Sequence, residues 1–209
     1  MEREKIVETL RYFEDLFGAE PRSELDYSTD IDLLVAVILS AQCTDKRVNT
    51  VTKELFKKYK TVQDYAKADL KVFEKEIYST GFYRNKAKNI ISMAQAVVAG
   101  HGGKIPGDMD ALTDLAGVGR KTASVFLAEF YKLPAIAVDT HVARVSKRLG
   151  FSTGKNPVQI ERDLKELFDK EVWRKVNHYM VLFGRYYCTA RGPRCGECKI
   201  NVQCTKYKI

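Results

Sequence analysis

The stretch Leu115-Ala-Gly-Val-Gly-Arg-Lys-Thr-Ala123 decides the fold, because it sets two glycines one residue apart between two segments with a helical pattern. Glycine has no Cβ, so Gly117 and Gly119 tolerate unusual backbone angles and let an anion approach the chain closely. Amides of the turn and of the following helix N-terminus then point toward one anion. The stretch predicts a tight helical hairpin that holds a phosphate without reading bases, although many Gly-x-Gly turns only join two helices.

Outside this hairpin, apolar residues recur at helical spacing along most of the chain, and no stretch alternates as a half-buried strand does. The segment Ile31–Leu39 is apolar on nearly every side, which predicts a helix buried in a core. Thr29 or Asp30 is expected to cap that helix, and Asp110 a short helix that ends at Leu115. The pattern therefore predicts an all-α protein.

Composition restricts the function classes. The 209 residues suffice for one large domain or two small ones, and 35 Lys and Arg against 27 Asp and Glu give a net charge of +8. This surplus favours a polyanionic partner. The first residues are charged, and the longest apolar run is too short to span a bilayer. We expect a soluble intracellular protein of the cytoplasm or nucleoid with no membrane partner.

Four of the five cysteines cluster near the C-terminus in the pattern C-x6-C-x2-C-x5-C, at Cys188, Cys195, Cys198 and Cys204. Such clustering in a chain otherwise poor in cysteine favours a metal centre over disulfides. The spacing and the ligand type leave zinc and an iron–sulfur cluster equally open. Arg191 and Arg194 lie in the loop between the first two cysteines, where they can contact phosphates or form a solvated surface.

Taken together, these stretches resemble the endonuclease III-type DNA glycosylases of the helix-hairpin-helix superfamily. The matching stretches occur in the family's order across nearly the whole chain and are Leu39-Ser-Ala-Gln-Cys-Thr-Asp45, Gly81-Phe-Tyr-Arg-Asn-Lys-Ala87, Leu115-Ala-Gly-Val-Gly-Arg-Lys-Thr-Ala123, Val138-Asp-Thr-His-Val142 and the four-cysteine tail. Two positions depart from the family pattern: Ala116 replaces the usual proline of the hairpin, and Cys43 replaces the usual alanine.

The resemblance implies two helical domains that flank a cleft. Residues 22–133 would form a helical barrel that carries the hairpin, and residues 1–21 with 134–209 would form an iron–sulfur domain. The cysteine spacing matches the family's [4Fe–4S] motif, so the resemblance favours this cluster over zinc. Lys121 and Asp139 would then face each other across the cleft.

The resemblance also implies a reaction: base excision repair of oxidised pyrimidines in double-stranded DNA by a monomeric enzyme, which turns the damaged base out of the stack. Lys121 matches the family's catalytic lysine, which attacks the sugar C1′, displaces the base and forms a Schiff base. Its place in the first turn of a helix disfavours the cation and so favours the neutral amine. Loss of a C2′ proton then expels the 3′ phosphate, which is the lyase step at damaged or abasic sites.

Asp139 matches the catalytic aspartate, which stabilises positive charge at C1′ or moves a proton; it is also a natural cap for a helix that begins near Thr140. Gln42 matches the residue that fills the hole left by the flipped base. Phe82 stands where the family inserts an apolar wedge, usually leucine, although it would serve equally as a core residue. The remaining expected contacts are to the DNA backbone, by Gly117, Val118, Gly119, Arg120, Arg191 and Arg194, and to the pocket, by Ser40, Asp45 and His141.

Three other functions fit parts of the sequence. A related mismatch-specific glycosylase for adenine or thymine often lacks the hairpin lysine, so Lys121 counts against it. A non-catalytic helix-hairpin-helix DNA-binding module needs no lysine–aspartate pair. A zinc-stabilised RNA-binding protein fits least well, because no interleaved basic and aromatic motif for single strands is present.

Overall fold

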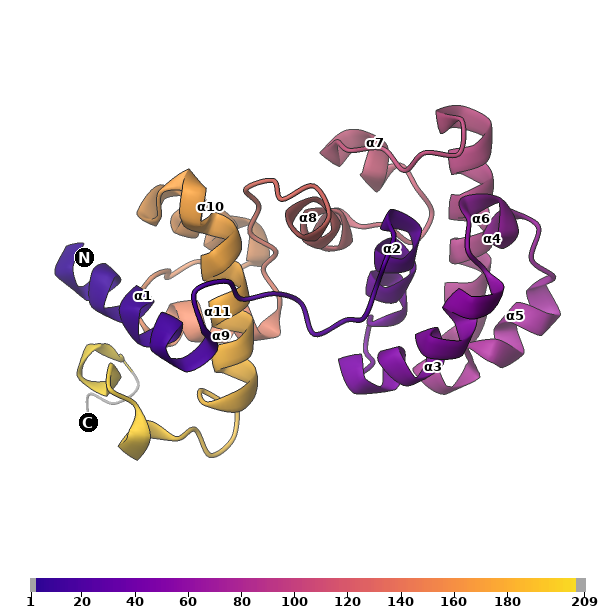
Figure 1. Cartoon of the computed structure of the whole chain (residues 1–209). Coiled ribbons are helices and arrows are strands. Elements are labelled where there is room, and N and C mark those ends of the chain that lie inside the picture. The colour runs from indigo at the N-terminus through magenta and orange to yellow at the C-terminus, as the bar shows by residue number, and fades with distance from the viewer. Residues whose placement is uncertain (1–2, 206–209) are drawn as a thin grey trace. The chain divides into compact units, whose positions relative to one another are not determined.

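The structure is a computed structural model that describes residues 3–205, in which every regular element is a helix (Figure 1). The prediction of an all-α protein is therefore confirmed for this part of the chain. The chain divides into two compact units: one is Ser23–Tyr131, and the other joins the segment up to Arg22 with the segment from Lys132 onward. These limits lie close to the expected boundaries at 22 and 133; residues 1–2 and 206–209 of the expected second domain lie outside the described residues.

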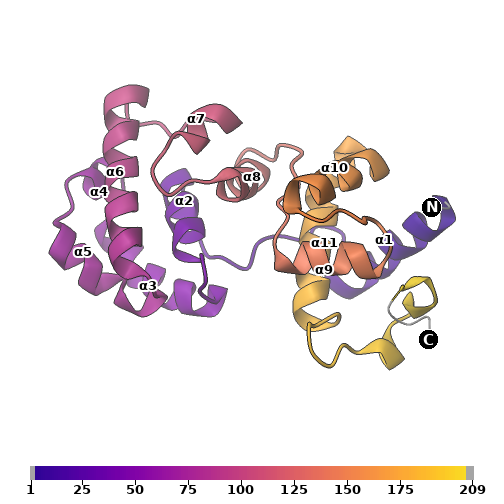
Figure 2. The ribbon, with the colours of Figure 1, turned by 180° about the vertical axis from the view of Figure 1, so that it is seen from behind.

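The unit Ser23–Tyr131 is built around one buried helix, α2 (Asp30–Leu39), whose residues from Ile31 onward are all buried. This helix contacts α3, α6 and α8 (Figures 1 and 2). The other elements of this unit are α3 (Asp45–Lys58), α4 (Val62–Ala66), α5 (Leu70–Glu76), the 3-10 turn η1 (Tyr78–Thr80), α6 (Tyr83–His101), α7 (Met109–Thr113) and α8 (Arg120–Glu129).

Caps that the sequence encodes fix where these helices begin. The Thr29 hydroxyl accepts a hydrogen bond from the Asp32 amide, and the Asp32 carboxylate accepts one from the Thr29 amide. This reciprocal capping box satisfies two amides that have no partner inside the helix. Of the two expected candidates, Thr29 is the cap and Asp30 is the first residue of the helix. The apolar run that follows is buried from the first turn.

The second unit contains α1 (Arg3–Phe17), α9 (Thr140–Arg148), α10 (Pro157–Leu167) and α11 (Trp173–Tyr186), with the 3-10 turns η2 (Lys170–Val172), η3 (Cys195–Glu197) and η4 (Asn201–Gln203). Helix α11 packs against both α1 and α9. Phe13 of α1 lies 4.9 Å from the Phe183 ring, centroid to centroid, in this second core. The C-terminal segment returns to α9, where the Thr205 amide donates to the Arg148 carbonyl at 2.7 Å.

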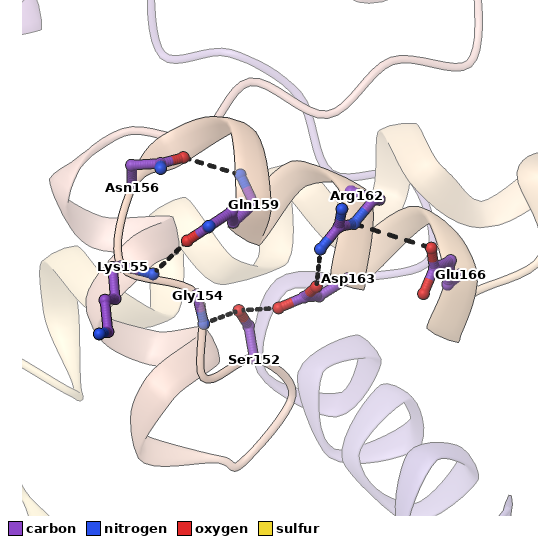
Figure 3. Close-up of polar contacts among 8 residues, drawn as sticks. All are labelled: Ser152, Gly154, Lys155, Asn156, Gln159, Arg162, Asp163 and Glu166. Atoms are coloured by element: carbon purple, nitrogen blue, oxygen red, sulfur yellow. Dashed lines mark hydrogen bonds and ion pairs between the residues drawn. The ribbon is translucent and has the colours of Figure 1, made fainter.

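The start of α10 is also fixed by a cap that the sequence encodes (Figure 3). Asn156 caps the helix by accepting a hydrogen bond from the Gln159 amide at 3.0 Å, and Pro157 occupies the first helical position. The preceding loop is held by Ser152, whose hydroxyl donates to Asp163 at 2.6 Å and accepts from the Gly154 amide (Figure 3).

The expected cap at Asp110 is wrong. Helix α7 begins at Met109, and Asp108 caps it by accepting a hydrogen bond from the Ala111 amide at 2.9 Å. Asp110 is the second residue of the helix, where its negative charge still interacts favourably with the helix dipole. The helix also ends at Thr113, two residues before the expected Leu115.

Helices long and apolar enough to cross a bilayer are absent from the described part of the chain.

Candidate functional site

The hairpin that joins α7 to α8 is anchored by two buried apolar residues. Leu115 and Val118 are 5% and 3% exposed, and the Val118 amide donates to the Leu115 carbonyl at 3.1 Å. Gly117 lies between them with a φ of 77°, and a Cβ there would stand 2.8 Å from the Asn89 Cβ of α6. Only glycine accepts both the positive φ and the close approach of Asn89, so Gly117 determines the turn.

The next glycine has a different role. Gly119 is the extended N-cap residue of α8, with a φ of −85°, and a Cβ built on it would meet no atom within 4 Å. Because glycine has no side chain to cap the helix, it supplies no acceptor for the first amides of α8. Arg120 and Lys121 occupy the first turn of α8, and both are exposed. Open backbone amides beside two cationic side chains form a suitable site for a phosphate.

Gln42 lies in the tight turn that joins α2 to α3. Ser40 ends α2 and donates its hydroxyl to the Val37 carbonyl at 2.8 Å, while Thr44 caps α3. Between them Gln42 is exposed and adopts a φ of 55°, a conformation that is uncommon for residues other than glycine. Asp45, the first residue of α3, is half-buried. Ser40, Gln42 and Asp45 therefore share one short connection.

Phe82 also occupies a strained turn. It follows Gly81 at the start of α6, with a φ of 49°, and its side chain is 63% exposed. An aromatic residue in the core would be buried, so the alternative interpretation of Phe82 as a core residue does not hold. Exposure of a large apolar ring in a constrained backbone conformation fits a part that contacts a ligand.

Asp139 ends an irregular segment and caps α9. Its Oδ1 atom accepts hydrogen bonds from the His141 and Val142 amides, both at 2.8 Å, as the capping interpretation expected. The segment before it is fixed where the Ala137 amide donates to Asn177 Oδ1 at 2.9 Å. Both bonds to Asp139 use one carboxylate oxygen, so the second oxygen does not take part in the cap.

His141 is held by Arg144, whose Nη2 lies 3.1 Å from His141 Nδ1 and donates to the Gly184 carbonyl at 2.7 Å. The backbone of α11 passes close to this histidine, since a Cβ on Gly184 would stand 2.8 Å from the His141 Cβ. His141 thus takes part in the packing of α9 against α11, and its expected place near the pocket stays a prediction.

The four C-terminal cysteines line one small pocket of about 20 Å³, whose other walls are Leu149, Phe183, Tyr187, Pro193, Arg194 and Asn201. Arg148 of α9 binds the segment at its start, because its Nη1 donates to the Cys188 Sγ at 3.2 Å and to the Thr189 carbonyl at 2.8 Å. Arg144 Nε donates to the Cys188 carbonyl at 3.0 Å. Neither arginine was predictable from the sequence, because their partners lie about forty residues further along the chain.

These thiols fit a metal cluster by their chemistry. Burial raises the pKa of the Cys198 thiol, so a buried thiolate here requires a cation for compensation. Within residues 3–205, no three His, Cys, Asp or Glu side chains converge closely enough to hold a metal ion as they stand. The four cysteines do line the same pocket, and four soft sulfur donors are the ligand set of an iron–sulfur cluster.

Arg191 and Arg194 are both exposed in the loop between the first two cysteines. The Arg194 guanidinium lies over the Tyr187 ring, 5.5 Å from its centroid, and the Arg194 amide donates to the Tyr187 carbonyl. The Thr189 hydroxyl donates to the Arg191 carbonyl at 2.8 Å. The loop is therefore a folded structure rather than a loose solvated one.

Comparisons with known proteins identify a family and several similar chains. Residues 35–170 match the model of the HhH-GPD superfamily base excision DNA repair proteins. The chain is 49% identical to endonuclease III of Bacillus subtilis (strain 168) over 182 residues, which cover 87% of this chain and 83% of the relative. It is similar to an endonuclease III in a non-covalent complex with DNA, with a TM-score of 0.94, 42% identity and coverage of 100% and 97%. An endonuclease III trapped as a covalent intermediate with DNA gives a TM-score of 0.94, 42% identity and coverage of 100% and 98%.

Proposed function

The chain belongs to the HhH-GPD superfamily of base excision DNA repair proteins, and we propose that it is a bifunctional DNA glycosylase and abasic-site lyase for oxidised pyrimidines. The observation that carries this proposal is the position of Lys121, an exposed amine in the first turn of the helix that follows the open glycine hairpin. A phosphate bound at the hairpin brings the adjoining deoxyribose within reach of that amine. Because the proposed substrate is double-stranded DNA, we expect the enzyme to act at the nucleoid.

In the proposed reaction, the neutral Lys121 amine attacks C1′ of the damaged nucleotide, and the bond from C1′ to the base breaks. The amine loses its proton, the sugar ring opens, and a Schiff base joins the lysine nitrogen to C1′. This iminium withdraws electrons from C2′, so a C2′ proton leaves and the C3′–oxygen bond breaks. The 3′ phosphate departs, and water then releases the enzyme.

Asp139 suits the charge that develops in this reaction. One carboxylate oxygen is fixed by two amides of α9, which holds the side chain in a single orientation. We propose that the other oxygen stabilises the positive charge at C1′ as the base departs, or carries a proton between the sugar and the amine.

We assign the remaining predicted site residues to binding the duplex and to keeping the damaged base outside the stack. The hairpin from Gly117 to Arg120 grips the backbone through its amides, and Arg191 and Arg194 add two cations that bind phosphates without base specificity. Gln42 fills the space that the flipped base leaves, and Phe82 enters the stack beside it as an aromatic wedge.

We further propose that Cys188, Cys195, Cys198 and Cys204 hold a [4Fe–4S] cluster. Support comes from their shared pocket, from the absence of histidine and carboxylate side chains among its walls, and from the hydrogen bond that Arg148 donates to Cys188 Sγ. When bound, the cluster supplies four metal–sulfur bonds that fix the C-terminal segment. The loop with Arg191 and Arg194 is then held at both ends by cluster ligands.

The test is activity on a panel of duplexes that each carry one change: thymine glycol, 5-hydroxycytosine, adenine opposite 8-oxoguanine, a G·T mismatch, an abasic site or none. We expect base release only from the two oxidised pyrimidines, and strand cleavage at these and at the abasic site. The 3′ end should carry the unsaturated sugar that β-elimination leaves. Activity confined to a mismatch, or binding without cleavage of any duplex, would instead support the mismatch glycosylase or the non-catalytic module.

A further inference from the structure

Lys86 of α6 is a buried lysine that the proposed reaction does not use. Its side chain is 5% exposed, and its Nζ donates hydrogen bonds to the Leu39 carbonyl and the Thr80 carbonyl, both at 2.8 Å. Both acceptors are neutral backbone groups, and burial lowers the pKa of the lysine, against an opposing effect of Cys43. Burial of a potential cation in a core is costly, so a lysine at this position requires an explanation.

The two carbonyls mark the starts of the two strained turns. Leu39 is the last residue of α2, three residues before Gln42, and Thr80 is the last residue of η1, two residues before Phe82. Both carbonyl oxygens lie 2.8 Å from the same Nζ atom, so they can be no further apart than twice that distance. The two turns therefore begin close together in space although they lie far apart in sequence. Gln42 and Phe82 are two of the three non-glycine residues with positive φ in the described chain.

We propose that Lys86 is a positioning residue for lesion recognition, which ties the Gln42 turn to the Phe82 turn so that both side chains enter the duplex together. This inference rests on the proposed function, because that function assigns the gap-filling and wedge roles to Gln42 and Phe82. Left-handed conformations at non-glycine residues persist only where the surroundings enforce them, and a shared anchor at the root of both turns does so.

An ammonium group suits this place better than an apolar side chain. It donates to two carbonyls at once, and it lies at the C-terminal end of α2, where the helix dipole favours a positive charge. An apolar side chain of equal length would fill the space but leave both carbonyls without this partner. Turns that are ordered before binding also avoid the entropic cost of being ordered on the DNA.

The test is the substitution Lys86→Met, which keeps the length of the side chain and removes the donors. Dissociation constants are measured for a duplex with a tetrahydrofuran abasic-site analogue and for the same duplex undamaged. Lys86→Met should lower the preference for the lesion by about tenfold, since flipping depends on both turns while backbone contacts do not. The matched control is Val97→Ala, which loosens the core at the other end of α6 and should leave the preference unchanged.

A double-mutant cycle separates positioning from mere stability. In a Gln42→Ala/Phe82→Ala background, Lys86→Met should change the preference less than about twofold, because the residues through which it acts are gone. Equal losses on both duplexes, additive losses in the cycle, or the same loss in Val97→Ala would overturn the proposal. Should Lys86→Met fail to fold, Lys86→Gln keeps one amide donor and enters the same cycle, with the same criteria.

Amide hydrogen exchange of the DNA-free protein provides an independent readout. Exchange in residues 39–43 and 80–84 should quicken in Lys86→Met and not in Val97→Ala. Unchanged exchange in Lys86→Met would show that Lys86 does not order the two turns, and would overturn this proposal even if the enzyme works as proposed. A wild-type protein that binds both duplexes equally well would overturn the lesion-reading role together with the proposed function.

Discussion

Asp139 combines two tasks in one side chain. Oδ1 accepts the two amides that begin α9, which leaves the second oxygen for the chemistry that we propose. The capping role was predictable, because a cap depends only on residues two and three positions ahead. The role of Lys86 was not predictable, because one of its acceptors, the Leu39 carbonyl, lies 47 residues away in sequence. The available signal was a lysine directly before Ala87 on a helix face that is otherwise apolar.

The two tasks of Asp139 can be separated by Asp139→Asn. Asparagine caps helices about as well as aspartate, so the free energy of unfolding should fall by less than about 1 kcal/mol. Base release from thymine glycol should slow by about a hundredfold or more, because the carboxylate charge is lost. Cleavage of a preformed abasic site should suffer less, since no base remains to be expelled. Single-turnover kinetics on both duplexes, together with thermal unfolding, check this; a large loss of stability would assign Asp139 mainly to the fold.

The hairpin shows how far a local pattern predicts an element. The two glycines on either side of Val118 predicted the turn. They did not predict that the two positions have different conformations and different surroundings. Gly117 is required by a φ of 77° and by the approach of Asn89, whereas Gly119 is extended and open to solvent. The cap of α7 was misplaced by two residues because Asp108 and Asp110 are chemically equal caps. The local sequence pattern does not distinguish them.

This difference predicts opposite effects of two alanine substitutions. Gly117→Ala should lower the free energy of unfolding by about 1–2 kcal/mol or more, because alanine is strained at positive φ and its Cβ would press on Asn89. Gly119→Ala should cost less than about 1 kcal/mol, yet weaken binding to any duplex, because its methyl group enters the space that a phosphate would occupy. Denaturant unfolding and binding to undamaged duplex measure the two effects. Equal effects of both substitutions on binding, after correction for stability, would contradict the phosphate assignment.

Considered as a whole, the chain carries a net charge of +8, part of it in the loop with Arg191 and Arg194. Binding to undamaged duplex should therefore weaken steeply as salt concentration rises. Arg191→Gln/Arg194→Gln should reduce the slope of log affinity against log salt by about two, because each arginine neutralises one phosphate. Single-turnover chemistry at saturating enzyme should change little. A slope equal to that of the wild type would exclude both arginines from the interface.

The cysteine-lined pocket leads to a prediction about metal content. Anaerobically purified protein should be yellow-brown and contain the iron of one four-iron cluster per chain, with no stoichiometric zinc. Cys198→Ser should lose iron and lower the thermal stability of the unit that contains α9 and α11. Elemental analysis and visible absorbance check both. Stoichiometric zinc without iron would contradict the cluster, and the sequence spacing alone could not have decided between the two metals.

The central claim is that the amine of Lys121 forms a Schiff base with the sugar of damaged DNA. Borohydride reduction of the reaction on duplex containing thymine glycol or an abasic site tests this most directly. We predict a covalent protein–DNA adduct, attached at Lys121 by peptide mass spectrometry. Lys121→Gln should form no adduct and cleave no strand while it binds the duplex as the wild type does. An adduct of undiminished yield in Lys121→Gln, or attachment at another amine of the wild type, would contradict the claim.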